Sequence, residues 1–220
     1  MTRSVYVFDA YGTLFDVHAA VRRHAGSIGP AAQRLSEIWR EKQLEYSWVR
    51  SLAGRYRDFW ALTEEALDYA LAASPGVDAG LRAELLEAYR DLDVYPEVPK
   101  ELAALKAAGA RLAILSNGSP RMLERAVASA RLDGIIDEVI SVDEIRIYKP
   151  SPAVYDLVET HFRVFPDAIS FQSSNRWDVA GATAHGMRAV WINRVGRPDE
   201  YADLPPAAVL PSLAGLYALG

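Results

Sequence analysis

The fold of this 220-residue chain is constrained most by its second half, where strand-like and helix-like segments alternate. Short apolar runs bounded by turn residues indicate strands, and apolar residues recurring at helical spacing indicate helices. The expected strands are residues 111–115, 138–141, 169–172 and 189–193. The expected helices are residues 99–108, 120–130, 152–162 and 179–185, and the tail at 205–220 is expected to form a turn and a short closing helix. Alternation of this kind predicts a parallel sheet flanked by helices.

One further strand precedes this alternation, and a long helical interval follows it. Residues 5–8 are apolar and end at Asp9, whereas residues 16–92 contain no convincing strand and have apolar side chains at helical spacing. Because this interval leaves the sheet directly after the first strand, it is expected to lie over the carboxyl end of that strand and to exclude water there. We therefore predict an α/β fold with a Rossmann-like parallel sheet core flanked by helices and an inserted all-helical cap domain. The core is expected at residues 1–15 and 93–220, and the cap at residues 16–92.

The composition excludes several classes of protein. A formal net charge of -5 argues against nucleic-acid binding, and it means that an anionic substrate must be attracted by local cations. The chain has no cysteine, which excludes disulfides, thiolate nucleophiles and cysteine-ligated metals. No apolar run approaches the length of a membrane span. The N-terminus enters the first strand without room for a signal peptide, so we expect a cytoplasmic protein without a membrane partner.

A carboxylate stands at the end of the first strand. In open α/β sheets, ligands bind outside the carboxyl ends of the strands, which makes Asp9 a candidate functional residue. The residue two places on is Tyr11 and not a second acid, followed by the turn residue Gly12. That position restricts the chemistry open to the chain.

Polar residues also follow other expected strands. Ser116 and Asn117 precede a glycine in a turn that offers hydroxyl, amide and backbone donors to an anion, although a plain turn or helix cap explains the tripeptide equally well. Lys149 lies between an extended segment and Pro150, which restricts its backbone. A lone lysine is more commonly a solvated surface charge.

Two more clusters have both a functional and an ordinary interpretation. The first cluster consists of Ser173, Asn175 and Asp178. It is a poor site for a hard divalent cation, which prefers several oxygen anions, but its side chains can orient a water molecule. The alternative is a cap on the helix at 179–185. In the expected cap, Arg40 shares a helix stripe with Leu44, so it has a reason to face a pocket, whereas the alternative is a solvated helix face.

Together these residues resemble the L-2-haloacid dehalogenases, a branch of the haloacid dehalogenase superfamily whose members mostly transfer phosphoryl groups. The phosphatases carry Asp-x-Asp, in which the second acid protonates the leaving alkoxide, whereas this chain has Asp9-Ala10-Tyr11. A halide leaving group needs no proton, and loss of the second carboxylate removes charge that would help to retain magnesium. The resemblance extends from Phe8 to about Gly186.

The resemblance implies roles for individual residues. The implied catalytic residues are Asp9, Lys149, Asp178, Asn175, Ser173 and Arg40. The implied substrate-binding residues are Tyr11, Arg40, Ser116, Asn117, Lys149, Tyr155, Leu44, Phe59 and Trp177. The apolar members of this set are equally compatible with ordinary core packing. The resemblance implies no cofactor and no metal, a small 2-haloacid as substrate, and a homodimer.

The reaction that the resemblance implies is hydrolysis of short L-2-haloalkanoic acids to D-2-hydroxy acids through an ester on Asp9. Either Asp178 or Lys149 could activate the water that hydrolyses the ester. The alternatives are a magnesium-dependent phosphatase of the same superfamily and a non-catalytic binding protein on the same fold. Arg176, a bulky cation between Asn175 and Trp177, could alter the pocket.

Overall fold

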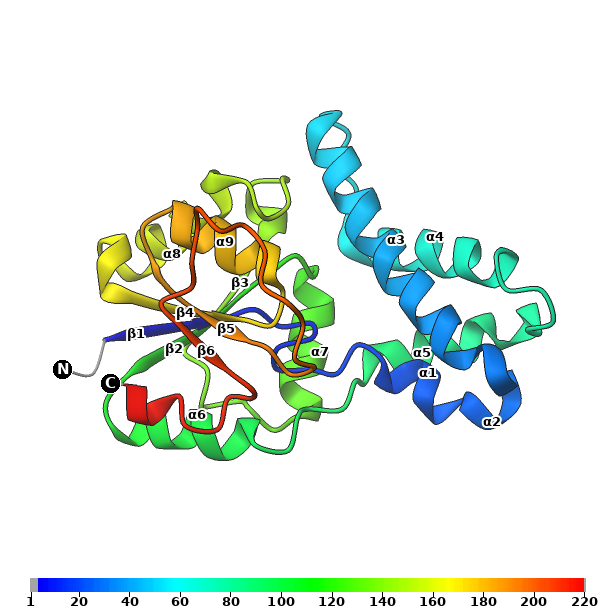
Figure 1. Ribbon diagram of the computed structural model, residues 1–220, viewed down its shortest axis with the longest axis horizontal. Coiled ribbons are helices and arrows are strands. Elements are labelled where there is room, and N and C mark those ends of the chain that lie inside the picture. Colours follow the sequence, from blue (N-terminus) through cyan, green and yellow to red (C-terminus); the bar gives the residue numbers. More distant parts are fainter. Residues whose placement is uncertain (1–3, 220) are drawn as a thin grey trace.

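A computed structural model describes residues 4–219 of the chain. Its centre is a six-stranded sheet in the order β3-β2-β1-β4-β5-β6, and every neighbouring pair of strands is parallel (Figure 1). The strands are β1 (Val5–Phe8), β2 (Arg111–Ser116), β3 (Glu138–Ser141), β4 (Ile169–Ser173), β5 (Arg188–Ile192) and β6 (Ala208–Leu210). All four residues of β1 are buried, as expected for a central strand covered on both faces.

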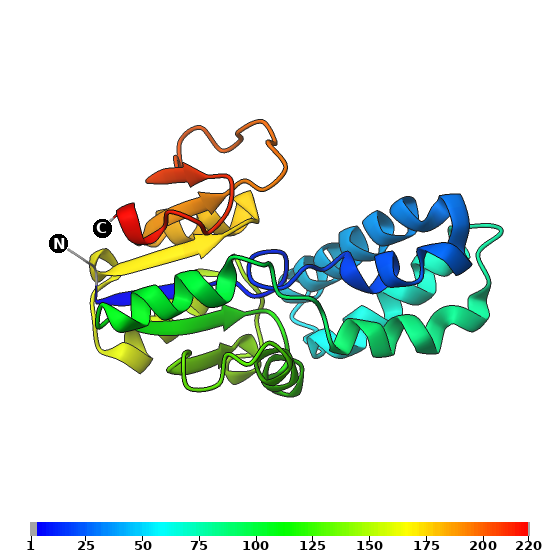
Figure 2. The same cartoon turned by 90° about the horizontal axis from the view of Figure 1, so that it is seen from below.

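Four helices cover the two faces of this sheet. They are α6 (Val98–Ala107), α7 (Pro120–Ser129), α8 (Pro152–Phe162) and α9 (Arg176–Ala184). Figures 1 and 2 show α6 and α7 on one face, with α8 and α9 on the other. A proline lies in the first turn of α6, α7 and α8, where its missing N–H leaves no bond unmade. The predicted α/β core is confirmed.

The residues between β1 and α6 are helical, as predicted. They form α1 (Ala19–Arg23), α2 (Ala25–Ile28), α3 (Ala32–Leu52), α4 (Phe59–Ala72) and α5 (Arg82–Arg90), with short 3₁₀ helices at Gly29–Ala31 and Ala79–Leu81. This bundle stands beyond the carboxyl edge of the sheet (Figure 1). None of the helices in residues 4–219 combines the length and the apolar character that a membrane span requires.

Two chain segments that run side by side connect the bundle to the core. The Asp16 amide donates to the Asp93 carbonyl (2.8 Å), and the Tyr95 amide donates to the Leu14 carbonyl (3.0 Å).

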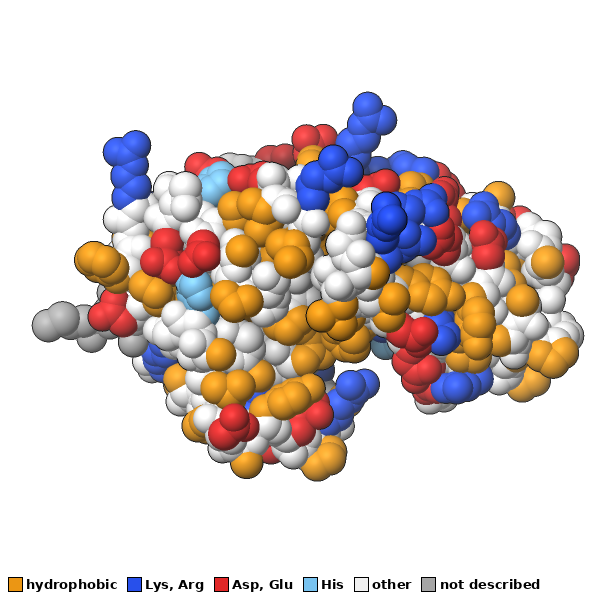
Figure 3. Space-filling model, turned by 90° about the horizontal axis from the view of Figure 1, so that it is seen from above, with side chains coloured by type: hydrophobic (Ala, Val, Ile, Leu, Met, Phe, Trp, Pro, Cys, Tyr) orange, Lys and Arg blue, Asp and Glu red, His pale blue; other side chains and the backbone are white. Residues whose placement is uncertain are grey.

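On the face drawn in Figure 3, hydrophobic side chains gather near the middle of the molecule, and charged side chains of both signs are scattered over the rest.

Two local features differ from the expectation. The tail forms the expected short closing helix, a 3₁₀ helix at Tyr217–Leu219, but it also contributes a sixth strand, β6, that was not expected; three partly exposed residues give too short a pattern to recognise. Helix α9 begins at Arg176, three residues earlier than expected. As a result, Asp178 lies within the first turn of α9 and Asn175 occupies the N-cap, without a side-chain capping bond, so the alternative interpretation of Asp178 as the helix cap is wrong.

Candidate active site

The predicted polar residues meet at the carboxyl edge of the sheet, where the strand order reverses between β1 and β4. Such a switch point opens a crevice at the ends of the strands. Asp9 follows β1 and is 6% exposed, and its amide donates to the Gln172 carbonyl (2.9 Å), which ties it to β4. Its carboxylate therefore has a backbone that the sheet holds in place.

The two oxygens of the Asp9 carboxylate have different surroundings. Oδ2 accepts hydrogen bonds from Asn175 Nδ2 (2.9 Å), Thr13 Oγ1 (3.0 Å) and Ser173 Oγ (3.5 Å). Oδ1 contacts Lys149 Nζ at 3.3 Å and has no other described partner. The side chain is thus fixed by Oδ2, while Oδ1 remains available to a substrate.

Below Asp9 lies a completely buried ion pair. Lys149 Nζ is 3.0 Å from Asp178 Oδ2, and neither side chain is exposed. Tyr155 donates its hydroxyl hydrogen to Asp178 Oδ1 (2.8 Å). Burial, opposed by the Lys149 charge, raises the pKa of Asp178 to about 6. Asp178 therefore changes protonation close to neutral pH, as a general base needs to do.

A small cavity lies above Asp9, and both the core and the helical bundle contribute to it. Its lining consists of Asp9, Tyr11, Arg40, Leu44, Phe59, Ser116, Asn117, Asn175 and Trp177. Arg40 reaches across from α3 and donates to the Tyr11 carbonyl (3.3 Å). Trp177 of α9 packs edge-on against Trp48 of α3, with ring centroids 5.5 Å apart. The small cavity is thus closed by groups from both parts.

The turn after β2 presents oriented donors to the small cavity. The Asn117 Oδ1 atom accepts a hydrogen bond from the Lys149 amide (3.0 Å), so its NH₂ group is the end left for a ligand. Ser116 Oγ accepts from the Gly118 amide (3.0 Å) and keeps its own hydrogen to donate. Such donors suit an anion.

Comparison with known proteins assigns the family. Residues 4–186 match the haloacid dehalogenase-like hydrolase family model. The chain is 50% identical over 214 residues to (S)-2-haloacid dehalogenase 1 of Pseudomonas sp. (strain CBS-3), covering 97% of this chain and 94% of that one. It is 46% identical over 214 residues to (S)-2-haloacid dehalogenase 4A of Burkholderia cepacia, covering 97% and 93%. The chain belongs to the L-2-haloacid dehalogenases.

Solved structures agree with this membership. The L-2-haloacid dehalogenase of Xanthobacter autotrophicus, with chloropropionic acid covalently bound, has a TM-score of 0.89 and 37% identity, and the match covers 99% of this chain and 98% of that one. A second dehalogenase structure has a TM-score of 0.97 at 44% identity, with 100% and 97% covered.

The dehalogenase site contains one residue that the sequence reasoning missed. Thr13 is fully buried; it donates to Asp9 Oδ2 and accepts a hydrogen bond from the Ser174 amide (2.8 Å). It thereby ties the loop after β1 to the loop after β4. A hydroxyl residue following Gly12 in the turn after Asp9 was the available signal.

Replacing Thr13 with valine keeps the volume but removes both hydrogen bonds. We expect halide release to fall about tenfold or more, because a small misplacement of a reacting group has a large effect on rate. Thr13→Ser is the matched control and is expected to retain most of the activity, since it keeps the hydroxyl. Equal activity of the valine and serine variants in a halide-release assay would contradict an orienting role.

Tyr155 does not line either cavity of the dehalogenase. It is fully buried behind Asp178, and burial raises its pKa well above the usual value. Gly181 makes this position possible, because a Cβ there would overlap the Tyr155 hydroxyl. In the structure this hydroxyl contacts Asp178, and the expected contact with substrate stays a prediction.

Arg176 points away from the small cavity. Its Nε donates to Asp199 Oδ1 (2.6 Å), and its Nη2 donates to the Leu204 carbonyl (2.9 Å) and the Tyr201 carbonyl (3.3 Å). It therefore anchors the loop after β5 and is not among the residues that line the small cavity. Among residues 4–219, side chains spaced to hold a metal ion occur on α8 and just after α9, at Asp156, Glu159 and His185, away from Asp9.

Proposed function

We propose that this chain hydrolyses short L-2-haloalkanoic acids to D-2-hydroxy acids, with inversion at the carbon that carries the halogen. The observation that carries the proposal is a buried Asp9 carboxylate with one restrained and one available oxygen, in a small cavity where Tyr11 replaces a second acid. The similarity to (S)-2-haloacid dehalogenases supports the substrate class. The relative with covalently bound chloropropionic acid supports a covalent intermediate.

In the first step, Asp9 Oδ1 attacks the carbon opposite the halide, forming a C–O ester bond as the carbon–halogen bond breaks. Three donors on Oδ2 hold the carboxylate in position, and such positioning supplies on the order of 7–11 kcal/mol of the barrier. The departing halide is received by Arg40 and the NH₂ group of Asn117.

The substrate carboxylate is held by Ser116, Lys149 and backbone amides after Asp9. Within residues 4–219, the amides of Gly12 and Thr13 already bond inside the turn, whereas those of Ala10 and Tyr11 have no partner. The amides that bind the carboxylate are therefore those of Ala10 and Tyr11. The alkyl group of the substrate is surrounded by four side chains that line the small cavity: Tyr11, Leu44, Phe59 and Trp177.

In the second step, a water attacks the ester carbonyl carbon and Asp178 accepts its proton. The bond between the Asp9 carbonyl carbon and the ester oxygen then breaks, and Asp178 returns the proton to the departing alkoxide, which leaves as the 2-hydroxy acid. Lys149 lies between Asp9 and Asp178, 3.3 Å and 3.0 Å from their oxygens, and stabilises the developing charge. Ser173 and Asn175 orient the water, and Tyr155 positions Asp178. The oxygen gained by the product comes from Asp9, which is restored by the water.

The residue at position 11 counts against the phosphatase alternative. The Tyr11 phenol is a far weaker acid than the carboxyl group that the phosphatases carry there, and burial raises its pKa well above the usual value, so it is poorly suited to protonate an alkoxide. No observation favours the phosphatase or a non-catalytic binding protein over the dehalogenase. We further propose that residues 16–92 act as the cap over a core formed by residues 1–15 and 93–220.

The direct test is halide release from each enantiomer of 2-chloropropionate in a chelating buffer, with the product resolved by chiral chromatography. We expect release from the L form alone and D-lactate as product, without added metal. Release from neither 2-chloropropionate nor chloroacetate would overturn the proposed function.

The pKa of Asp178 predicts the pH dependence of the second step. Because burial raises this pKa to about 6, Asp178 becomes protonated as the pH falls through 6 and can no longer accept a proton from water. We expect single-turnover ester hydrolysis to slow below pH 6, and the Asp178→Asn variant to accumulate the ester. An unchanged pH profile in that variant would assign the base role to another group.

The homodimer remains a prediction. Light scattering on the purified protein measures the molar mass and checks it, against a chain mass of 24.2 kDa.

A further inference from the structure

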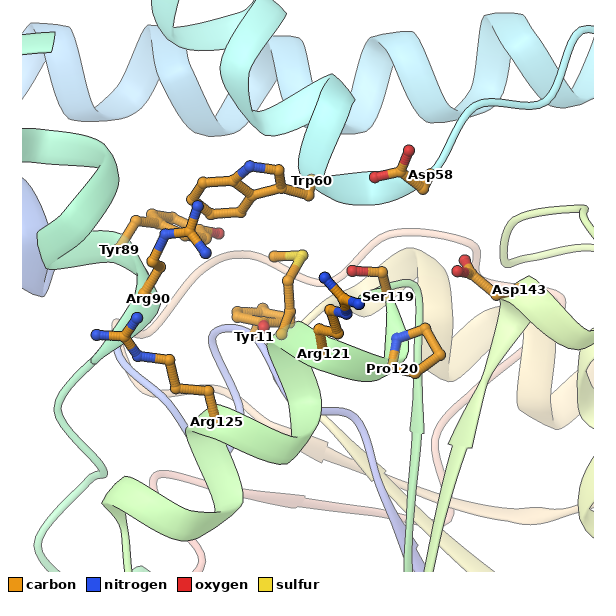
Figure 4. A pocket seen from close by; sticks show the side chains of 11 residues that line it. Tyr11, Asp58, Trp60, Tyr89, Arg90, Ser119, Pro120, Arg121, Arg125 and Asp143 are labelled. Atoms are coloured by element: carbon orange, nitrogen blue, oxygen red, sulfur yellow. The ribbon is translucent and has the colours of Figure 1, made fainter. Parts of the chain in front are cut away.

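A second, larger cavity lies between the helical bundle and the core. It has a volume of about 510 Å³ and is shown in Figure 4. Residues of α4, α5, α7 and the loops line it, and Tyr11 also lines the small cavity above Asp9. Tyr11 therefore forms a wall that the two cavities share.

Two largely buried residues present hydroxyls to the larger cavity, and these hydroxyls have no hydrogen-bond partner among residues 4–219. Tyr11 is 4% exposed, and its hydroxyl bonds to no other group. Ser119 is 9% exposed and occupies the N-cap of α7, yet its hydroxyl does not cap the helix. Neither hydroxyl oxygen is among the fully enclosed polar atoms that lack a partner, so both are open to the larger cavity and can bond to a ligand or to water there.

These hydroxyls lie beside further donors. The amides of Arg121 and Met122 are in the first turn of α7, where helix geometry provides no partner and the helix dipole favours an anion. Arg121 is exposed and has no ion pair in the described part of the chain. In Figure 4, Arg121 lies between Tyr11 and Ser119. The donors at the N-terminal end of α7 are thus two hydroxyls, of Tyr11 and Ser119, two backbone amides and the guanidinium of Arg121.

The other charged groups of the cavity already have partners. Arg125 bonds to Asp91 (2.7 Å) and to Glu87 (2.6 Å), and Arg90 lies over the Trp60 ring. At the far end, Asp58 caps α4 and Asp143 accepts a hydrogen bond from Tyr56. Among the described residues that line the larger cavity, Arg121 is therefore the cation without a partner.

We propose that this larger cavity is an antechamber that binds the carboxylate of the 2-haloacid before it passes Tyr11 to reach Asp9. The proposal rests on the proposed function. The ligand chemistry is a small monocarboxylate, so the 2-hydroxy acid product can occupy the same site on its way out. With a net charge of -5, the chain needs such a local cation to attract an anion.

Tyr11 is suited to separate the two cavities. Its carbonyl accepts hydrogen bonds from Arg40 and Asn175, which hold its backbone. Its ring stacks on Tyr89, with centroids 5.9 Å apart, and rests on Gly118, where a Cβ would lie only 2.8 Å away. Passage of the substrate therefore requires rotation of the ring and not movement of the backbone.

The first test is the rate of substrate association, followed by stopped-flow tryptophan fluorescence in the Asp9→Ala background, which prevents turnover. Trp60 lines the larger cavity and can report its occupancy. We expect R121Q and S119A to lower the association rate constant for L-2-chloropropionate by about 3- to 10-fold at low ionic strength, with a weaker dependence on salt for R121Q. The matched control is R188Q at the opposite edge of the sheet, which removes the same charge and is expected to leave the rate unchanged.

The second test locates the ligand. Crystals of the Asp9→Ala enzyme soaked in 2-bromopropionate are expected to show anomalous bromine signal near Ser119 as well as above residue 9, and the signal near Ser119 is expected to vanish in the added R121Q variant. Signal above residue 9 alone, together with unchanged association rates, would overturn the antechamber. If wild-type enzyme releases halide in that case, only this inference fails; if it releases none, the proposed function fails independently.

Discussion

Replacement of Asp9 with alanine is expected to lower halide release from L-2-chloropropionate by at least about 10⁴-fold, the scale seen when a covalent nucleophile is removed. Among residues 4–219, no other carboxylate lines the small cavity, so no neighbour there can take over the attack. Asp178, the nearest candidate, is completely buried and paired with Lys149. The measurement is initial-rate halide release at saturating substrate.

The control for this variant is Asp167→Asn, which alters an exposed carboxylate just before β4, and it is expected to keep full activity. Circular dichroism checks that both variants fold. A complementary measurement is a single turnover in ¹⁸O-labelled water: the label is expected in the protein and not in the product. An Asp9→Ala enzyme with more than a small fraction of wild-type activity would contradict the assignment.

Replacement of Lys149 with methionine is expected to lower both stability and activity. Lys149 is the fully buried cation between Asp9 and Asp178, so its loss leaves two carboxylates facing one another without a counter-charge. Removing one partner of a buried ion pair destabilises a protein by about 3–5 kcal/mol. Chemical denaturation measures the loss, and halide release is expected to become undetectable because, in the proposed mechanism, the substrate carboxylate also loses its cation.

The double variant Lys149→Met/Asp178→Asn separates the structural role from the catalytic one. Because the second change removes one of the two uncompensated charges, it is expected to recover a large part of the unfolding free energy but no activity. Recovery of activity would mean that Lys149 acts only by neutralising Asp178. A Lys149→Met enzyme as stable as the wild type would contradict the electrostatic account of the pair.

Much of the fold was predictable because its determinants are local. Apolar runs and helical spacing located β3 and α8 at their observed bounds. The contrast between the alternating second half and the helical interval predicted the insertion into the sheet. Strand β6 was missed because its three partly exposed residues owe their extended form to pairing with β5, a contact between distant segments.

The sequence by itself determined the chemistry that is possible at the strand ends: a carboxylate at position 9, no acid at position 11, and polar residues after β2 and β4. These features follow from residue identity and from the rule that parallel strands present their carboxyl ends at the same edge of the sheet. Only the tertiary structure decided how Thr13, Tyr155 and Arg176 are used, since hydrogen-bond partners depend on side-chain direction. It also decided that Tyr11 divides two cavities, because cavity walls arise where α4, α5 and α7 pack across the boundary between bundle and core.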